Sequence, residues 1–365
     1  MMITAGNGFI EQSDRYAFNN AGESLKKYIL LERGELAYNR GASKLRPYGS
    51  CFALTTVEKA RIPFVYHCFS VEKSNPEFLS IELNGANVEN QLRKIVSSGA
   101  RMDGLLNIAY SEYTEVTVQL PKKEEQDWIA KFFKHLDTLI TLHQRKYEKL
   151  VNIKKSMLDK MFPKNGASVP EIRFKGFTDL WEQRKVGELL TERNEQAPMS
   201  DEYPLMAFIA NEGVAPKGER YDRSALVNDT ASKLYKKTKF GDFIYSSNNL
   251  ETGSIGLNKY GKASISPVYS IFKPTGIADS DFLGRRLIRK DFINEMVKWR
   301  QGVIYGQWRI HESDFIKIEV TVPTVEEQYK LGLLLDNLDT LITLHQRKLE
   351  KLQNIKKSCL EKMFV

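Results

Sequence analysis

The chain has 365 residues, of which 42% are hydrophobic, and this length and composition suffice for two or more folded domains. Its 54 Lys and Arg residues outnumber its 46 Asp and Glu residues, and the formal charge of +8 is compatible with a polyanionic partner. Three cysteines without CxxC spacing exclude a disulfide framework and a Cys-rich zinc site, and the lack of a long apolar run predicts a cytoplasmic protein without membrane contact.

Residues 1–122 are predicted to form a first globular domain that ends in a strand. Val116, Val118 and Leu120 alternate with polar residues, which is the pattern of a half-buried strand. This predicted strand stops at Pro121 and leads directly into the next element.

Residues 123–163 are predicted to form a long helix, because apolar residues recur at alternating steps of three and four. A helix of about 40 residues, at about 1.5 Å per residue, is roughly 60 Å long. Such a heptad pattern requires a partner helix to bury its apolar seam. The seam residues of this helix that we expect at the interface are Leu136, Ile140, Tyr147 and Leu150.

Residues 164–322 are predicted to form a second globular domain, which follows the turn-rich linker PKNGASVP. This domain opens with EIRFKGFTDLWEQRKVGELLTERNEQ, a stretch that has no counterpart in the first domain. The first domain therefore lacks about 35 to 40 residues that the second possesses. An alternating strand is expected again at 316–322.

Residues 323–365 are predicted to form a second long helix. Thr324 and Glu327 have the spacing of a capping box at its start. Residues 338–364 repeat residues 136–162 at an offset of 202, with 23 of 27 positions identical. The seam residues of this copy are Leu338, Ile342, Leu349 and Leu352.

The repeat predicts the architecture, because each long helix is the natural partner of the other. The expected fold is α+β, with two globular domains of mixed β-sheet and helices. Two long antiparallel coiled-coil-like helices join the domains with pseudo-two-fold symmetry. His143 and His345 fall on the seam, where a structural role is favoured over metal binding. A near-identical spacer between divergent domains suggests a bipartite, asymmetric target.

Patterns of catalytic residues are incomplete in this sequence. The string GLNKYGKA at 256–263 resembles a phosphate-binding P-loop, but Ala263 stands where a Ser or Thr is needed and a strand-like stretch follows. The string SNPEF at 74–78 is similar to the NPP-plus-aromatic motif of amino-methyltransferases, but Glu77 replaces the second proline, so a surface turn is expected. No histidine has metal-ligand spacing with another. We therefore expect no catalytic residue and no metal site, that is, a non-enzyme.

Polar loop residues in both domains are suited to nucleic acid, because Arg matches guanine edges and phosphates while Asn and Gln match adenine. The alternative for each residue is that it belongs to an ordinary polar loop and binds no ligand. The basic pairs Lys26/Lys27 and Lys236/Lys237 are expected to be solvated. The candidate DNA-binding residues are Arg40, Lys44, Arg46, Arg101, Asn107, Asn248, Asn249, Lys262, Arg300, Tyr305, Gln307 and Arg309.

The helix string LDTLITLHQRKLEKLQNIKKSCLEKMF, the preceding VPTVEEQ and the opening PEIRFKGFTDLWEQRKVGEL resemble the specificity (S) subunit of type I restriction-modification systems. The resemblance implies two target recognition domains, each reading one half of a split site in double-stranded DNA. It implies that the helices at 123–163 and 323–365 dock two adenine methyltransferase (M) subunits and that restriction (R) subunits join them. S-adenosylmethionine, ATP and Mg would then bind to the partner subunits and no cofactor to this chain.

The departure from that family is the start of the chain, where an opening similar to PEIRFKGF is expected before the first domain. The first recognition domain thus resembles one without its first 35 to 40 residues, which puts its reading of a half-site in doubt. The alternatives are a DNA-reading module of a fused nuclease or methyltransferase, and an inactive rearranged specificity variant. A coiled-coil scaffold that binds no DNA is a third.

Overall fold

The structure is a computed structural model, and it describes residues 1–14, 26–96, 105–164, 167–216, 233–304 and 307–364. The chain divides into two compact units. Unit 1 comprises residues 1–146 and 345–365, and unit 2 comprises residues 147–344. None of the helices in the described ranges is both long and apolar enough to cross a membrane.

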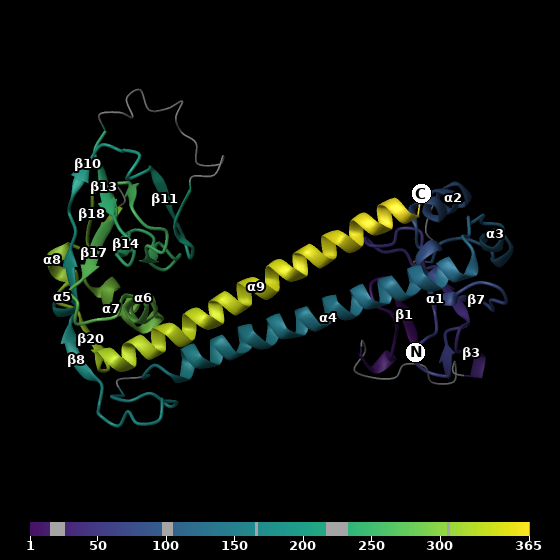
Figure 1. Cartoon of the computed structure of the whole chain (residues 1–365), viewed down its shortest axis with the longest axis horizontal. Helices are drawn as coiled ribbons and strands as arrows, with labels where there is room; N and C mark the ends of the chain where they lie inside the picture. The colour runs from purple at the N-terminus through teal and green to yellow at the C-terminus, as the bar shows by residue number, and fades with distance from the viewer. Residues whose placement is uncertain (15–25, 97–104, 165–166, 217–232, 305–306, 365) are drawn as a thin grey trace. The chain divides into compact units, whose positions relative to one another are not determined.

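Unit 1 is built from short antiparallel strands, small helices and parts of both long helices (Figure 1). Strand β4 lies between β5 and β7, strand β3 pairs with β6, and β1 and β2 form a hairpin. Its elements are β1 (Met2–Thr4), β2 (Gly8–Ile10), a 3₁₀ turn (Gln12–Asp14), β3 (Ile29–Glu32), β4 (Leu36–Asn39), β5 (Ser50–Ala53), β6 (Lys59–Ile62), β7 (His67–Phe69), α1 (Pro76–Glu82), α2 (Ala86–Ile95) and α3 (Tyr110–Thr114).

Unit 2 repeats this plan and adds strands to it. Strand β14 lies between β15 and β17, and β13 pairs with β16. Its elements are β8 (Glu182–Lys185), α5 (Val186–Leu189), β9 (Leu190–Glu192), β10 (Gln196–Ala197), β11 (Met206–Ile209), β12 (Gly213–Pro216), β13 (Tyr235–Thr238), β14 (Phe243–Tyr245), β15 (Ile255–Leu257), β16 (Ala263–Ile265), β17 (Ser270–Pro274), α6 (Ser280–Leu287), α7 (Lys290–Lys298), β18 (Gln301–Ile304), β19 (Gln307–Arg309), α8 (Glu312–Phe315) and β20 (Glu319–Val322).

The same local chemistry starts the helix after the sheet in each unit. Asn75 caps α1 by accepting a hydrogen bond from the Phe78 amide at 2.9 Å. Asp279 caps α6 in the same way, accepting from the Phe282 amide at 2.8 Å. An Asn or Asp at this position satisfies an amide that the helix leaves free. The SNPEF string is therefore the cap and first turn of a helix with Phe78 buried, so the expectation of a surface turn is wrong.

The long helices are α4 (Lys123–Lys160) and α9 (Val325–Met363). Within unit 1, the first part of α4 lies beside the last part of α9, and an ion pair joins Asp137 to Lys356 at 2.5 Å (Figure 1). Within unit 2, Lys154 and Asp339 form the pair that corresponds to it at the repeat offset of 202. Each unit therefore contains a corresponding contact between antiparallel stretches of the two helices.

His143 and His345 meet within unit 1, with their Nδ1 atoms 2.9 Å apart. Burial, with the nearby Lys348 charge, lowers the pKa of His143 and favours its neutral form. The predicted seam residues lie along the helix pair. Leu136 and Leu338 are buried, and the others are half-buried, namely Ile140, Tyr147, Leu150, Ile342, Leu349 and Leu352. The predicted fold class, α+β with two long antiparallel helices, is confirmed.

Two further sequence-based expectations are wrong. Residues 116–120 form no strand, whereas β20 at the corresponding place in unit 2 pairs with β8 over Glu319–Val322. An alternating segment needs a neighbouring strand, and unit 1 has no described counterpart of β8. The side chains of Lys236 and Lys237 are buried, not solvated. The Lys237 ammonium donates to the Ser264 hydroxyl at 2.9 Å and lies over the Tyr203 ring.

Candidate nucleic-acid interface

In unit 2, the loop after β14 and the β18–β19 hairpin are joined by hydrogen bonds. The Trp308 amide donates to Asn248 Oδ1 at 2.6 Å. The Ile310 amide donates to Ser247 Oγ at 3.0 Å, and Arg300 Nε donates to the Ser247 carbonyl at 3.1 Å. Candidates separated by about 50 to 60 residues in sequence are thereby brought to one surface.

The two arginines on this surface differ in whether their charge is already paired with a carboxylate. Arg300 is held by Glu251 in a bidentate pair, with N···O distances of 3.0 and 2.8 Å. This hydrogen bonding lowers the pKa of Glu251, so the pair stays ionised and its charges compensate each other. Arg309 keeps 66% of its side chain exposed, and its nearest carboxylate, that of Glu312, is 3.8 Å away. Arg309 is thus the cation most available to an external anion on this surface.

Other residues complete the surface around Arg309. Asn248 and Asn249 are exposed in the loop, and Trp308 is 45% exposed beside them. Exposed amides can read base edges, and an exposed aromatic ring supplies apolar contact area. We call Asn248, Asn249, Trp308 and Arg309 the unit 2 reading surface. Trp308 stands between the candidates Gln307 and Arg309 in the sequence, in a run of residues suited to nucleic acid.

Lys262 immediately precedes β16. Its ammonium pairs with Glu202 at 2.5 Å, and that hydrogen bond raises the pKa of Lys262. The residues after it form strand β16 and not a helix, which agrees with the exclusion of a P-loop from the sequence.

In unit 1, two arginines of the candidate set are engaged within the fold. The Arg40 guanidinium donates to the carbonyls of Val65 and Ile108 at 3.3 and 3.5 Å. The Arg46 guanidinium donates to the Asn84 carbonyl at 2.6 Å and to Glu89 at 3.4 Å.

Lys44 and Asn107 are exposed, and the isolated β-bridge between Gly41 and Leu105 brings their two chain segments together. They are the accessible candidates in this unit. Arg101 and Tyr305 lie outside the described residues, as does the side chain of Gln307.

The long helices also carry an exposed apolar stripe that the seam analysis missed. On α4, Leu139 and Leu142 are 43% and 55% exposed, and on α9 the corresponding Leu341 and Leu344 are 43% and 57% exposed. The signal was present in the sequence, because all four belong to the repeated LITLHQRK string, one position before the seam residues Ile140 and His143 or their counterparts. Each unit thus presents an equivalent apolar surface, which we call the outer leucine pair.

The described part of the chain holds no cluster of three or more His, Cys, Asp or Glu side chains placed to bind a metal ion. The geometry assembled here consists of exposed amides, one accessible guanidinium and an aromatic ring. Such groups can recognise an anionic, hydrogen-bonding ligand such as duplex DNA.

Comparison with known proteins identifies solved structures that are similar to this chain. No protein-family model matches the chain, and no curated protein matches it. The HsdS subunit of Thermoanaerobacter tengcongensis is 17% identical, with 92% of this chain and 81% of that chain covered and a TM-score of 0.44. A structure from a study of complex assembly and conformational transition of the type I R-M system is 16% identical, with 92% and 82% covered and a TM-score of 0.41.

The type I restriction-modification S subunit of M. genitalium is 14% identical to this chain. The alignment covers 92% of this chain and 84% of that chain, with a TM-score of 0.52. The fold relationship rests on this structure. The chain therefore has the fold of a type I restriction-modification S subunit.

Proposed function

We propose that the chain is the DNA sequence-specificity subunit of a type I restriction-modification complex. The observation that carries the proposal is the combination of an S-subunit fold with two units that share one plan and differ in their exposed polar residues. Each unit would read one half of a bipartite, asymmetric site in double-stranded DNA. The chain would perform no catalytic step itself and would act in the cytoplasm.

Reading by unit 2 would use the surface around Arg309. A guanidinium can donate two hydrogen bonds to a guanine edge, and the Asn249 amide can pair with adenine in the major groove. Asn248, whose Oδ1 accepts from the Trp308 amide, would offer its Nδ2 group as a donor. Arg300, already neutralised by Glu251, would support the loop instead of contacting DNA.

Docking of the M subunits would use the outer leucine pairs on the long helices. Because the two pairs lie in the same repeated string, they suit two copies of one partner. The R subunits would join that assembly. S-adenosylmethionine, ATP and Mg would be bound by the partner subunits, which would supply the methylation and cleavage chemistry.

The Arg309→Ala variant is expected to weaken binding to one half-site by about 1–3 kcal/mol, because it removes a bidentate donor to a base edge. The measurement is fluorescence anisotropy with duplexes in which each half-site is varied separately. The matched control is Lys262→Ala, which removes a cation of the same unit that is already paired with Glu202.

An equal loss on every sequence would instead assign Arg309 to a phosphate. The wild-type chain should also lose affinity with rising salt, with log K falling at a slope of about −0.9Z against log salt when Z phosphates are neutralised. A slope of zero would contradict DNA binding altogether.

Replacing the exposed Leu142 and Leu344 by Asp is expected to abolish assembly with the M subunit while leaving the fold intact, because each substitution puts charge on a surface that must be desolvated. Co-purification and sedimentation of the chain with its M subunit measure the effect. The control is Leu180→Asp, at a leucine that is 68% exposed in unit 2 and lies off the helices. Normal assembly of the double variant would refute this docking surface.

A further inference from the structure

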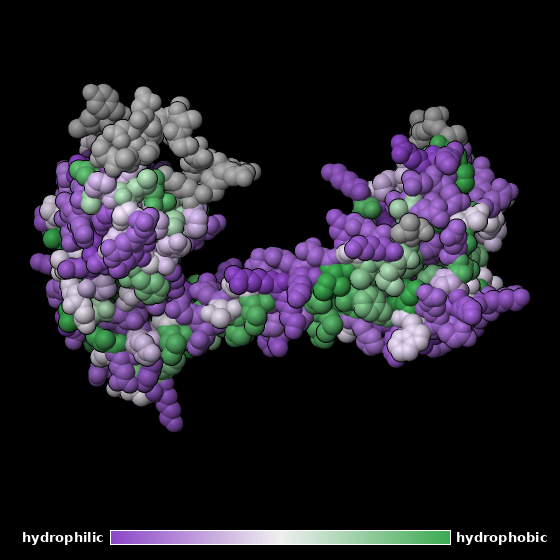
Figure 2. Space-filling view, turned by 45° about the horizontal axis from the view of Figure 1, so that its top comes forward, coloured by the Kyte–Doolittle hydropathy of each residue, from purple (hydrophilic) through white to green (hydrophobic). Residues whose placement is uncertain are grey.

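Unit 2 has a further exposed polar turn, at the tip of the hairpin that β11 and β12 form (Figure 1). Ala210, Asn211 and Glu212 make this tip, and all three are exposed. Figure 2 shows that the face of unit 2 drawn there is mostly hydrophilic, so a polar turn is not by itself a sign of function. The position of this turn and the way in which it is held distinguish it.

The tip is attached to the loop after β14, which carries two residues of the reading surface. The Asn211 amide donates a hydrogen bond to the Gly253 carbonyl at 3.0 Å. The next residue of that loop, Ser254, donates its amide to the Asn249 carbonyl at 2.9 Å. The hairpin tip and the reading surface therefore lie side by side in unit 2.

Only a glycine fits where the tip meets the loop. Gly253 has a φ of +95°, a backbone conformation that L residues rarely adopt. A Cβ atom added there would lie 2.3 Å from Asn211 Oδ1. Asn211 has a φ of +64°, alone among the non-glycine residues that the structure describes, and asparagine tolerates this left-handed region better than most residues. The contact thus joins two residues with uncommon backbone conformations and fixes the tip against the loop.

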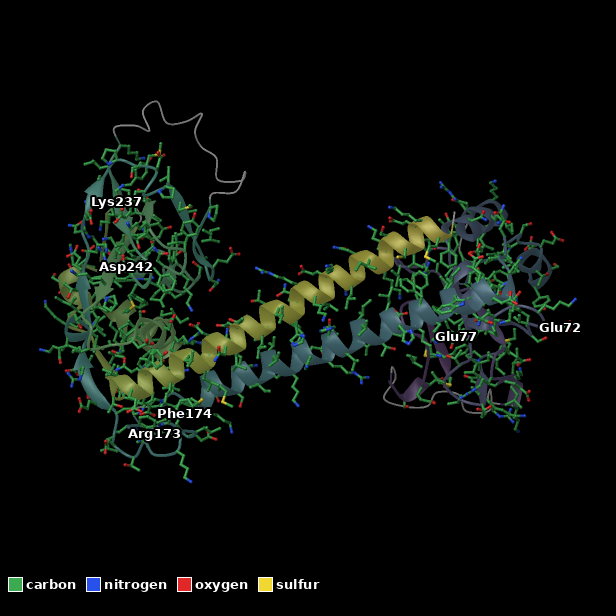
Figure 3. The ribbon with its side chains drawn as sticks, viewed as in Figure 1. Glu72, Glu77, Arg173, Phe174, Lys237 and Asp242 are labelled. Carbon is green, nitrogen blue, oxygen red and sulfur yellow. The ribbon has the colours of Figure 1, made fainter. Side chains whose placement is uncertain are left out.

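The rest of the hairpin is anchored to the sheets of unit 2. Phe208 and Val214 are buried in one cluster with Ile244 of β14. Ser264 of β16 forms a β-bridge with the residue just before β11. The Ser264 hydroxyl also accepts a hydrogen bond from the buried Lys237 ammonium, which Figure 3 labels. A turn on such a scaffold holds its exposed side chains in place.

Unit 1 contains the same hairpin with a different tip. Strands β1 and β2 pair in the register of β11 and β12, since Thr4 lies opposite Gly8 as Ile209 lies opposite Gly213. Both glycines have a positive φ, of +66° and +87°. The tips read Ala-Gly-Asn in unit 1 and Ala-Asn-Glu in unit 2. The frame is shared while the exposed side chains differ, which is the pattern expected of an element that determines specificity.

We propose that the β11–β12 hairpin is a second reading element of unit 2 and that Glu212 contacts a base in the major groove of DNA. The inference rests on the proposed DNA-reading function. A carboxylate only accepts hydrogen bonds, so it selects the amino group of cytosine or adenine over the carbonyl of guanine or thymine. Because it also repels phosphates, Glu212 contributes to discrimination between bases and not to overall affinity. Asn211 and Gly253 are positioning residues that hold the tip beside Asn249.

Selection from a library of duplexes with randomised positions, by the chain assembled with its M subunit, tests the role of Glu212. Glu212→Gln is expected to fold, because the residue is exposed and the change keeps its shape. The amide gains a donor, so the preference for cytosine or adenine at one position should fall by about 5- to 150-fold. That position should lie in the half-site that Arg309→Ala alters, and duplexes without the site should bind no more weakly. An unchanged preference, a change in the other half-site, or an equal loss on all sequences would overturn the proposal.

A pair of glycine variants tests the contact that positions the tip. Gly253→Ala places a Cβ against Asn211, so it should displace the tip and weaken the same base preference as Glu212→Gln. The matched control is Gly276→Ala in the same unit, where φ is +92° and an added Cβ meets no described atom within 4 Å beyond its chain neighbours. It introduces a similar backbone strain without the clash and should keep the preference. Equal specificity of the two variants would overturn the positioning role.

The selection also separates this inference from the proposed function on which it rests. A native complex that bound no duplex would contradict both. A native complex that selected a split motif, with the same motif selected by Glu212→Gln, would overturn the role of the hairpin and leave the specificity function in place.

Discussion

The Arg173→Ala variant is expected to lower the free energy of unfolding of unit 2 by about 3–5 kcal/mol, because it leaves a buried carboxylate without its partner. The side chain of Glu327 is 1% exposed and that of Arg173 is 14% exposed, so water cannot replace the lost pair. Hydrogen exchange of peptides from unit 2 measures the effect on that unit separately.

The matched control is Arg184→Ala, which breaks ion pairs with Glu182 and Glu188 at the surface of the same unit. Pairs of this kind contribute about 0–1 kcal/mol, so a small change is expected there. A loss no larger than that of the control would contradict the buried pair as a clamp between residues 170–192 and α9.

The Leu338→Glu variant is expected to destabilise unit 2 by about 3 kcal/mol or more, because it removes a buried leucine and places a carboxylate in the helix seam. Leu338 is 8% exposed and belongs to the core cluster of unit 2. Leu136 holds the same place in the core of unit 1, at 7% exposure. Leu136→Glu should therefore destabilise unit 1 to a similar extent.

Thr340→Glu is the control for Leu338→Glu, because Thr340 is exposed two residues away on α9. Thr138, exposed two residues from Leu136 on α4, gives the control Thr138→Glu for the unit 1 variant. The stability of each control should stay within about 0.5 kcal/mol of the native chain. Hydrogen exchange resolved by unit distinguishes the two seam variants. If either seam variant left both units as stable as its control, the paired-helix arrangement would be refuted.

The long helices could be predicted almost to the residue because their determinants are local. The heptad pattern is written in the sequence of each helix, and the repeat identifies the partner. The seam spacing therefore anticipated the burial of Leu136 and Leu338. Met363, at the end of the same pattern, is 45% exposed, because the pattern alone does not tell where the packing ends.

The strand expected at 116–120 shows the limit of local patterns. Its alternation equals that of β20, but a strand exists only when a neighbour completes its hydrogen bonds, and β8 provides that neighbour only in unit 2. Lys236 and Lys237 fail for a related reason. The Pro198 carbonyl and the Ser264 hydroxyl that hold the Lys237 ammonium come from distant parts of the sequence.

The sequence could predict which residue types are suited to DNA. It could not predict which of these side chains are free to contact DNA in the folded protein. Arg300 and Arg309 are the same residue type in the sequence. In the structure, Glu251 pairs with Arg300, whereas Arg309 stays accessible. Arg40 is similarly engaged by carbonyls at Val65 and Ile108. Such partners are set by tertiary contacts, so the sequence could name a set of candidates but could not order them.

Sequencing of methylated bases in cells that express this chain with its M subunit tests the proposed specificity role most directly. The account predicts an adenine-methylated motif in two different halves separated by a gap, and Arg309→Ala should relax or abolish one half. A motif with one half, or a palindrome, would mean that unit 2 reads alone or in a pair. Absence of any methylated motif, with the M subunit bound, would contradict the account and favour an inactive rearranged variant.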